Sequence, residues 1–513
     1  RPRSALQRKI NAARQELAKL LSDSLITPAK ARHIAAWEPF DSQISADFFD
    51  PHWMFGRSVA TGFDIVIGNP PYFKENDDKR RFEGLRELGC YQGKMDVWYL
   101  FVEIGLKFLK ENGHLSFIAT NNWVTNAGAS KLRNLVMTES TLIRMMDFQD
   151  YMVFESASIQ TMIMLLRKGP PAPRYQTEIL KANGQFGKAD IESINDPSNK
   201  APGNMLCFAV EICSAELKDR PLLFNPETES PLLNLLESNG PIRLLDSEIA
   251  QGIAPNPDCV NSRNIKTIGE TLAAKRGIKV GDGVFVLTEV ESHLISSSER
   301  NYLKPLYEPT HISKYSKKPT DLKIIYSKKG VINPQDCPSI LAHLHKYREI
   351  MEARRENLTG QLQYYHLHWP RDESFFKAGP KILVPRKCAT PTFYYTEDEA
   401  YVMLSMNVIR SSRYDLRFLS AVLNSSVVKY WLKRRGSMQG MNFQIDSGPL
   451  QRIPIPNAPN DIQCLISRLV SIIQTVEACN KSDLKKHTQL LQDLIDGCVT
   501  ECYLQDLMAE NKI

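Results

Sequence analysis

The feature that most constrains this chain is a short apolar run that ends in a proline-stiffened turn. Residues 63–67 read Phe-Asp-Ile-Val-Ile, and a β-branched run of this length before a turn predicts a buried strand. Gly68 ends the run, and the sequence Asn-Pro-Pro-Tyr follows at 69–72. Since ligands of open α/β sheets bind at the carboxyl ends of strands, the turn is predicted to form part of a functional site.

The turn also has a specific chemistry. Pro70 and Pro71 have a fixed φ and no backbone donor, so the carbonyl groups here can point outward as acceptors beside the amide oxygen of Asn69. A conjugated amine that donates to the Asn69 oxygen and the Pro70 carbonyl has its lone pair drawn out of conjugation and can attack an electrophilic methyl group. Tyr72 can stack on the ring that carries the amine. The alternative is a strand that ends in a Pro-Pro turn without chemistry.

The string Asn69-Pro70-Pro71-Tyr72 resembles motif IV of the S-adenosylmethionine-dependent amino-methyltransferases. This family acts on adenine N6 in DNA, and some relatives act on glutamine side chains. Asp96 stands where the family has its motif V acid, and Phe154 fits motif VIII. The resemblance implies that residues 69–72 are catalytic and that Tyr72 and Phe154 stack on the two faces of the target base. Core packing is the alternative for Phe154.

The segment that follows the turn alternates between predicted strands and helices. Strands are predicted at 63–67, 114–119, 143–148 and 159–166, and helices at 95–109 and 127–137. This alternation predicts a doubly wound α/β sheet, and the resemblance makes it a Rossmann-like methyltransferase sheet whose N-terminal part is missing.

The cofactor-binding turn of the family, Phe-x-Gly-x-Gly, does not occur before residue 63. Asp47 and Phe48 are the remaining candidates for cofactor binding. The chain starts at Arg1 without an initiator Met, and residues 4–24 resemble the end of a helical insertion found in type IIG relatives. We therefore expect an upstream part of the same protein to carry the cofactor motif and a nuclease. We expect this chain alone to be inactive and to bind S-adenosylmethionine poorly, which calorimetry can test.

The character of the sequence changes after residue 225. Short β-like runs are separated by turns, and Lys and Arg interleave with aromatic residues. Basic groups contact phosphates, and polar side chains on such loops reach base edges. The block resembles the α+β target-recognition domain of type IIG (Eco57I-like and TaqI-like) restriction-modification enzymes, which implies double-stranded DNA as a partner. Ordinary surface lysines on a β-rich domain are the alternative. The candidate DNA contacts are Arg276, Lys279, Lys314, Lys377, Lys381, Arg386, Lys387, Arg434 and Arg435.

These observations divide the chain into five parts. We expect a helical arm at 1–35, the catalytic domain at 36–170, a linker or excursion at 171–225, the recognition domain at 226–456 and a helical hairpin at 457–513.

Composition limits the function classes. An apolar content of 42% and a charged content of 24% are ordinary for a globular protein. The net charge of +6 is compatible with nucleic acid without indicating it. The ten cysteines include no Cys-x-x-Cys pair, so we expect reduced thiols, no metal site and a cytoplasmic protein. No apolar run has the length of a membrane span.

The sequence therefore predicts site-specific N6-adenine methylation of DNA within a type IIG restriction-modification protein. The target adenine would leave the duplex to reach the turn. Two alternatives stay open. One is a protein glutamine methyltransferase, and the other is a DNA-specificity module of a phage-exclusion system that is inactive on its own. The recognised DNA sequence depends on loop geometry and is not predicted.

Overall fold

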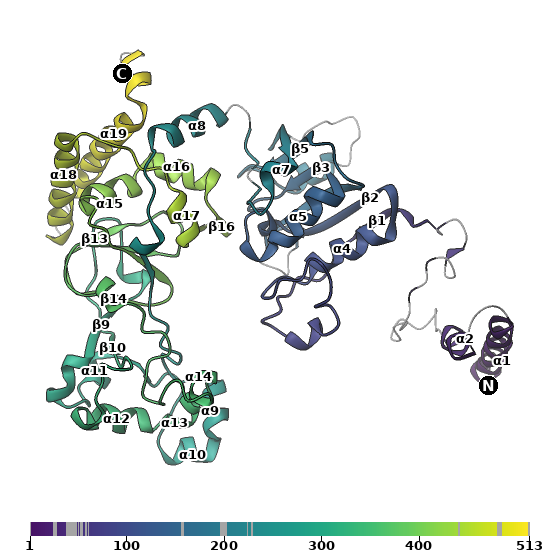
Figure 1. Ribbon diagram of the computed structural model, residues 1–513, viewed down its shortest axis with the longest axis horizontal. Coiled ribbons are helices and arrows are strands. Elements are labelled where there is room, and N and C mark those ends of the chain that lie inside the picture. The colour runs from purple at the N-terminus through teal and green to yellow at the C-terminus, as the bar shows by residue number, and fades with distance from the viewer. Residues whose placement is uncertain are drawn as a thin grey trace.

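The computed structural model describes residues 2–23, 28–36, 49, 51, 55–56, 59, 61–154, 159–194, 203–222, 224–226, 229–439, 442–479 and 485–510. Figure 1 shows a body built on one large sheet, a longer C-terminal body, and the N-terminal helices α1 (Pro2–Ser22) and α2 (Pro28–Ala35). Within the described residues, no helix has both the length and the apolar character that crossing a membrane requires.

The first body is organised by a six-stranded sheet with the order β1-β2-β4-β3-β5-β6. β1 runs parallel to β2, and β3 runs parallel to β5, whereas β4 is antiparallel to both of its neighbours and β6 is antiparallel to β5. The strands are β1 (Phe63–Gly68), β2 (Leu109–Thr120), β3 (Ser140–Asp147), β4 (Thr161–Lys168), β5 (Arg174–Ala182) and β6 (Met205–Cys213).

The two faces of this sheet contact different helices. Successive residues of a strand point to opposite faces, and accordingly Met145 belongs to the core under α4 (Trp98–Phe108) and α5 (Ser130–Glu139), whereas Met146 belongs to the core under α6 (Lys188–Ile194). Gly105 lets α4 approach the sheet closely, because a Cβ there would lie 2.5 Å from Leu115 Cδ1.

The expected linker at 171–225 is wrong. β5 and β6 lie within it and form the far edge of the sheet, paired residue by residue from Arg174 with Cys213 to Ala182 with Met205. The short helix α7 (Ser214–Leu217) follows. The polar composition of these strands hid their pattern, because each strand buries only some of its side chains and the segment between them is rich in turn residues.

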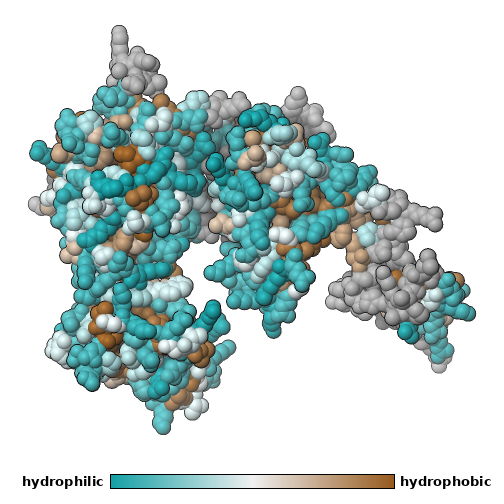
Figure 2. Space-filling view, in the orientation of Figure 1, coloured by the Kyte–Doolittle hydropathy of each residue, from teal (hydrophilic) through white to brown (hydrophobic). Residues whose placement is uncertain are grey.

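β1 is an edge strand in the part of the chain that the structure describes. Its side chains Ile65 and Ile67 are 66% and 79% exposed. Figure 2 shows hydrophobic surface on the body that carries this sheet. An unpaired apolar edge of this kind is a surface to which a further strand can add.

The C-terminal body contains three smaller sheets around two apolar cores. Their strand orders are β14-β9-β10-β8, β13-β11-β15-β7 and β12-β17-β16. The strands are β7 (Ile249–Gln251), β8 (Val286–Leu287), β9 (Leu303–Tyr307), β10 (Lys323–Ile325), β11 (Lys381–Pro385), β12 (Lys387–Cys388), β13 (Tyr394–Thr396), β14 (Tyr401–Val402), β15 (Met406–Ile409), β16 (Met438–Gln439) and β17 (Asn442–Gln444).

Helices surround these sheets and end the chain. They are α8 (Ser230–Asn239), α9 (Ser262–Ile268), α10 (Glu270–Lys275), α11 (Glu289–Ser292), α12 (Pro338–His345), α13 (Arg348–Glu352), α14 (Arg355–Leu358), α15 (Leu416–Asn424), α16 (Ser426–Arg435), α17 (Ser447–Arg452), α18 (Asn460–Ala478) and α19 (Lys485–Glu510). The mixed α/β fold with a helical tail is confirmed.

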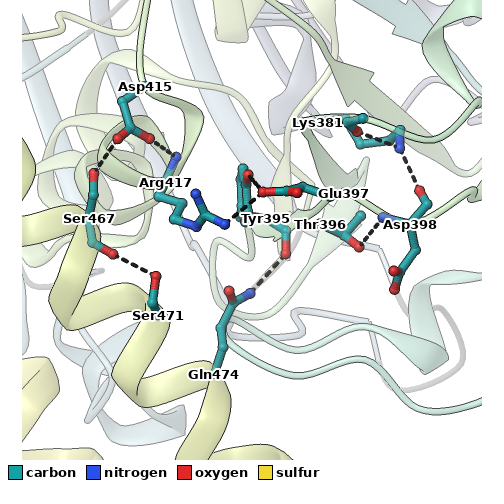
Figure 3. Close-up of polar contacts among 11 residues, drawn as sticks. Lys381, Tyr395, Thr396, Glu397, Asp398, Asp415, Arg417, Ser467, Ser471 and Gln474 are labelled. Atoms are coloured by element: carbon teal, nitrogen blue, oxygen red, sulfur yellow. Dashed lines mark hydrogen bonds and ion pairs between the residues drawn. The ribbon is translucent and has the colours of Figure 1, made fainter.

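Polar contacts join the helical tail to the rest of the C-terminal body. In Figure 3, Gln474 of α18 donates to the Tyr395 carbonyl at 2.8 Å, and Ser467 donates to Asp415 at 2.8 Å. Asp415 also caps α15 through the backbone N–H of Arg417. α18 and α19 therefore pack on the recognition body and share its core.

Arg133 of α5 clamps the loop that follows β2. Its guanidinium is buried and donates to the carbonyls of Trp123 at 2.7 Å, Asn126 at 2.6 Å and Arg220 at 3.0 Å. We expect Arg133→Met to lower the free energy of unfolding by roughly 2–5 kcal/mol, because it leaves three carbonyls without their donor. Urea denaturation measures the loss. Arg144→Met is the control, since Arg144 is exposed and pairs with Glu178, and such pairs contribute at most about 1 kcal/mol. Equal losses in the two variants would contradict the clamp.

Candidate functional site

The predicted turn lies at the carboxyl end of β1, beside β2. Gly68 pairs with Phe117 of β2, and the chain then turns through the exposed Asn69, the buried Pro70 and the exposed Pro71. The hydroxyl of Tyr72 lies 2.5 Å from Asn69 Oδ1 and 2.8 Å from the carbonyl oxygen of Ile118 in β2. Tyr72 therefore ties the turn to β2 and fixes the Asn69 amide, while Asn69 stays accessible from solvent.

The surroundings keep the Tyr72 hydroxyl protonated. Burial, and secondarily the carboxyl group of Asp96, raises the pKa of Tyr72 to about 12. A hydroxyl that stays neutral at physiological pH remains a donor, so its hydrogen bond to the turn persists.

Asp96 lies next to the turn in space. Its backbone forms an isolated antiparallel β-bridge with the backbone of Lys74, and the adjacent N–H of Val97 donates to the Phe73 carbonyl at 3.0 Å. Its side chain is 7% exposed, and burial raises the pKa of Asp96 to about 6. Asp96 Oδ1 has no hydrogen-bond partner among the described residues. Asp96 therefore places beside the turn a carboxyl group that is costly to ionise.

The loops after the neighbouring strands bring further polar groups to the same edge. Asp147 ends β3 and is buried, and it accepts hydrogen bonds from Asn121 Nδ2 and the Gln149 N–H, both at 3.0 Å. Burial raises the pKa of Asp147. The sequence prediction missed this group, although a polar residue directly after a buried strand is the signal that identified Asn69.

A pocket of about 540 Å³ separates this edge from α16 of the C-terminal body. The volume lies in the range of small-ligand sites. One wall carries side-chain amides, and the other carries the basic face of α16 with β16 and β17. Members of the two walls include Asn121, Asn122, Asp147, Gln149, Gln160, Lys181 and Asn183 on one side and Lys429, Lys433, Arg434, Met438 and Phe443 on the other.

Two predicted DNA contacts on α16 have acidic partners. Arg434 pairs with Glu229 through distances of 2.6 and 2.8 Å, and its guanidinium lies over the Tyr430 ring. Arg435 lies 3.6 Å from Glu237. Both arginines thus connect α16 to the segment around α8.

Three other predicted contacts are held inside the recognition body. Lys381 is fully buried and donates to the carbonyls of Gly379 and Asp398, a bond drawn in Figure 3, and burial lowers the pKa of Lys381 to about 8. Lys314 donates to the Asn424 carbonyl at 3.0 Å, and Arg386 pairs with Asp446 at 2.6 Å. The burial of Lys381 corrects its assignment as a phosphate contact.

The remaining candidates lie nearer the surface. Arg276 pairs with Glu349 at 2.8 Å, and the exposed Lys377 lies 3.3 Å from Glu373. Lys279 and Lys387 are exposed and form no side-chain ion pair with another described residue. Seven of the nine predicted basic side chains therefore have partners within the chain, and those of Lys279 and Lys387 are the two without one in its described part.

The candidate for base stacking lies within the described residues, and the candidates for cofactor binding do not. Phe154 is partly exposed in the loop after β3, and its ring contacts no other aromatic ring in the described part of the chain. Asp47 and Phe48 lie outside the described residues. The described residues offer an acceptor site at Asn69 and no glycine-rich turn for the cofactor, so they fit the acceptor side of methyl transfer and not the cofactor side. No group of metal-ligating side chains occurs among the residues described.

Comparisons with known proteins agree with this architecture. Residues 7–154 match the Eco57I restriction-modification methylase, and residues 304–455 match the TaqI-like C-terminal specificity domain. The chain is 24% identical over 444 residues to the type II methyltransferase M.PaeR7I of Pseudomonas aeruginosa, which covers 82% of this chain and 69% of that protein. It is 23% identical over 355 residues to M.BanIII of Aneurinibacillus aneurinilyticus, which covers 66% of this chain and 58% of that protein.

One solved structure shares the fold. The type IIL restriction-modification enzyme MmeI, solved in complex with DNA, superposes with a TM-score of 0.53 at 11% identity over 86% of this chain and 54% of that one. The chain thus spans about half to seven-tenths of the length of these proteins. It carries an Eco57I-like methylase domain followed by a TaqI-like C-terminal specificity domain.

Proposed function

We propose that this chain contributes the methyl-acceptor site and the DNA-recognition part of a type II restriction-modification methyltransferase that methylates adenine N6 in double-stranded DNA. The observation that carries the proposal is the exposed amide of Asn69, held at a proline-stiffened turn by Tyr72. The specificity domain and the relatives named type II methyltransferases support DNA as the substrate.

The turn prepares the amine by hydrogen bonding alone. Two N–H groups of the adenine amine donate to Asn69 Oδ1 and to the Pro70 carbonyl, which draws the nitrogen lone pair out of conjugation. S-adenosylmethionine supplies the electrophilic methyl group when bound. The positive charge that develops on the nitrogen faces two carbonyl dipoles, and preorganised dipoles of this kind stabilise a transition state. The nitrogen then loses one proton to solvent.

The target adenine leaves the duplex before it meets Asn69. Extrusion costs a few kcal/mol, and stacking on the Tyr72 ring offsets part of that cost. Phe154 is the candidate for the opposite face, because it lies in a loop at the same edge of the sheet. The exposed Lys279 and Lys387 are the predicted phosphate contacts whose side chains have no hydrogen-bond or ion-pair partner in the described chain.

A DNA-specificity module without activity of its own is the second candidate. It is favoured by the lack of a cofactor turn among the described residues. Methylation of a protein glutamine is disfavoured, because the match over 304–455 is to a specificity domain. A methylation assay on the complete gene product, with and without S-adenosylmethionine, separates the first two candidates.

Asn69→Ala tests the acceptor site. Removal of one preorganised hydrogen-bond partner costs about 10²–10³-fold in rate, so we expect methylation of DNA by the complete gene product to fall by that factor. DNA affinity should stay within about twofold, because the turn contributes little to phosphate binding. Asn76→Ala, an exposed asparagine in the loop that follows, is the matched control. A near-normal rate for Asn69→Ala excludes the mechanism.

Tyr72 makes two contributions that two variants separate. Tyr72→Phe keeps the ring and removes the hydroxyl that holds Asn69, so we expect the methylation rate to fall about tenfold, the worth of one hydrogen bond. Tyr72→Ala also removes the stacking surface, so the fluorescence of 2-aminopurine at the target position should report less extrusion. Identical rates and fluorescence in the two variants would contradict this division.

The charge on Asp96 sets a pH dependence of stability. Because burial raises the pKa of Asp96 to about 6, the protonated form favours folding, and its stabilisation is complete below pH 3.8 and lost as the pH rises through 6. We expect Asp96→Asn to match the native chain at pH 4 and to exceed it above pH 7 by at most about 3 kcal/mol. Thermal unfolding across this pH range measures the difference. A variant that is destabilised equally at every pH would contradict the assignment.

A further inference from the structure

We infer that the pocket between the catalytic edge and α16 holds the phosphodiester backbone beside the extruded adenine, and that Lys429 and Lys433 contact its phosphates. The inference rests on the proposed function, because it takes DNA as the partner. It adds two basic residues that the sequence prediction did not include.

The pocket adjoins the catalytic turn. Tyr72 donates to the carbonyl of Ile118, and β2 continues from there for two residues to Thr120. Asn121 and Asn122 follow directly and line the pocket. A nucleotide chain whose base reaches Asn69 would therefore place its neighbouring backbone at or near this pocket.

The acidic groups around the pocket already have partners. Asp147 accepts from Asn121 and Gln149, and Asp150 accepts from Gln160 Nε2 at 2.7 Å. The ionised Glu229 is held by Arg434, which lowers the pKa of Glu229. The donors to Asp147 and Asp150 are neutral amides and do not cancel their charge. The lining nevertheless carries four basic side chains, Lys181, Lys429, Lys433 and Arg434, against these two carboxyl groups, so the pocket keeps a net positive charge.

Two of the four basic groups, Lys429 and Lys433, are free to meet a ligand. Lys429 and Lys433 are four residues apart on α16 and share one helix face. Both are exposed, both line the pocket, and neither forms a hydrogen bond or ion pair through its side chain with another described residue. Val428 and Leu432, each about 100° around the helix from the lysine that follows it, are buried in the core of the C-terminal body, and their burial fixes the rotation of α16 about its axis.

The partly buried Lys181 is different. Its ammonium donates to the Phe224 carbonyl, and burial lowers the pKa of Lys181. This hydrogen bond holds the Lys181 ammonium in place, so it is not available to a phosphate. Exposed ammonium groups on long side chains suit phosphate oxygens as point charges. The side-chain amides of Asn121, Asn122 and Asn183 on the opposite wall offer donors and acceptors to sugar and base edges.

The first test is the salt dependence of DNA binding by this chain, which needs no cofactor. Each phosphate contact contributes about 0.9 to the slope of log Kd against log salt concentration. We expect Lys429→Gln with Lys433→Gln to reduce the slope by about 1.8 and to weaken binding to all duplexes alike. Fluorescence anisotropy measures both. An unchanged slope overturns the inference.

The second test locates the contact. The probe is a duplex with one adenine opposite an abasic site, which makes that adenine easy to extrude, and with methylphosphonate at the phosphates that flank it. We expect the neutral phosphates to weaken binding by the native chain about tenfold and to have no effect on the double variant.

Arg263→Gln with Lys266→Gln on α9 is the matched control. It removes the same charge from two exposed residues that have no side-chain partner in the described chain. We expect this variant to keep the methylphosphonate effect. If the effect persists in the Lys429 and Lys433 variant, the inference is wrong while DNA methylation can stand. If the native chain binds no DNA in any form, the proposed function falls with it.

Discussion

The hydrogen bond from Tyr72 holds the Asn69–Tyr72 turn in place. Its hydroxyl lies within hydrogen-bond distance of both Asn69, the first residue of the turn, and the carbonyl of Ile118 in the adjacent strand. The two prolines restrict the backbone of the turn, and Arg133 clamps the loop after β2 with bonds to two of its carbonyls, Trp123 and Asn126. Two neighbouring strand ends are thus fixed relative to one another, which is the condition for presenting two acceptors to one amine.

The distribution of partners among the basic residues separates structural from available charge. Arg386 and Arg434 are bound by carboxylates, and Lys381 by backbone carbonyls, so these groups hold loops and helices together. Lys429 and Lys433 lie on the same helix as Arg434 and have no such partners. One face of a helix can therefore make structural ion pairs while another keeps exposed charge. The burial of Val428 fixes the orientation of the two faces.

The position of the turn could be predicted from sequence because its backbone is set by neighbouring residues. Four consecutive residues set the backbone, the acceptor and the ring, and the run before them identifies a strand. Neither β5 and β6 nor the state of the lysines could be predicted in this way. The partner of Arg434 is 205 residues distant in the chain and that of Arg386 is 60 residues distant, so the folded arrangement alone shows that these charges are paired.

The same long-range pairs connect the six-stranded sheet to the C-terminal body. Asn225, just after the catalytic sheet, donates to the Arg434 carbonyl at 3.3 Å, and Glu229 holds the Arg434 side chain. The segment that leaves the sheet is thereby bonded to both the backbone carbonyl and the side chain of Arg434 on α16. The helix α16 shares its core with the sheets of the specificity domain. Because a bidentate ion pair holds both of its groups in one geometry, this pairing fixes α16 relative to the segment that leaves the six-stranded sheet.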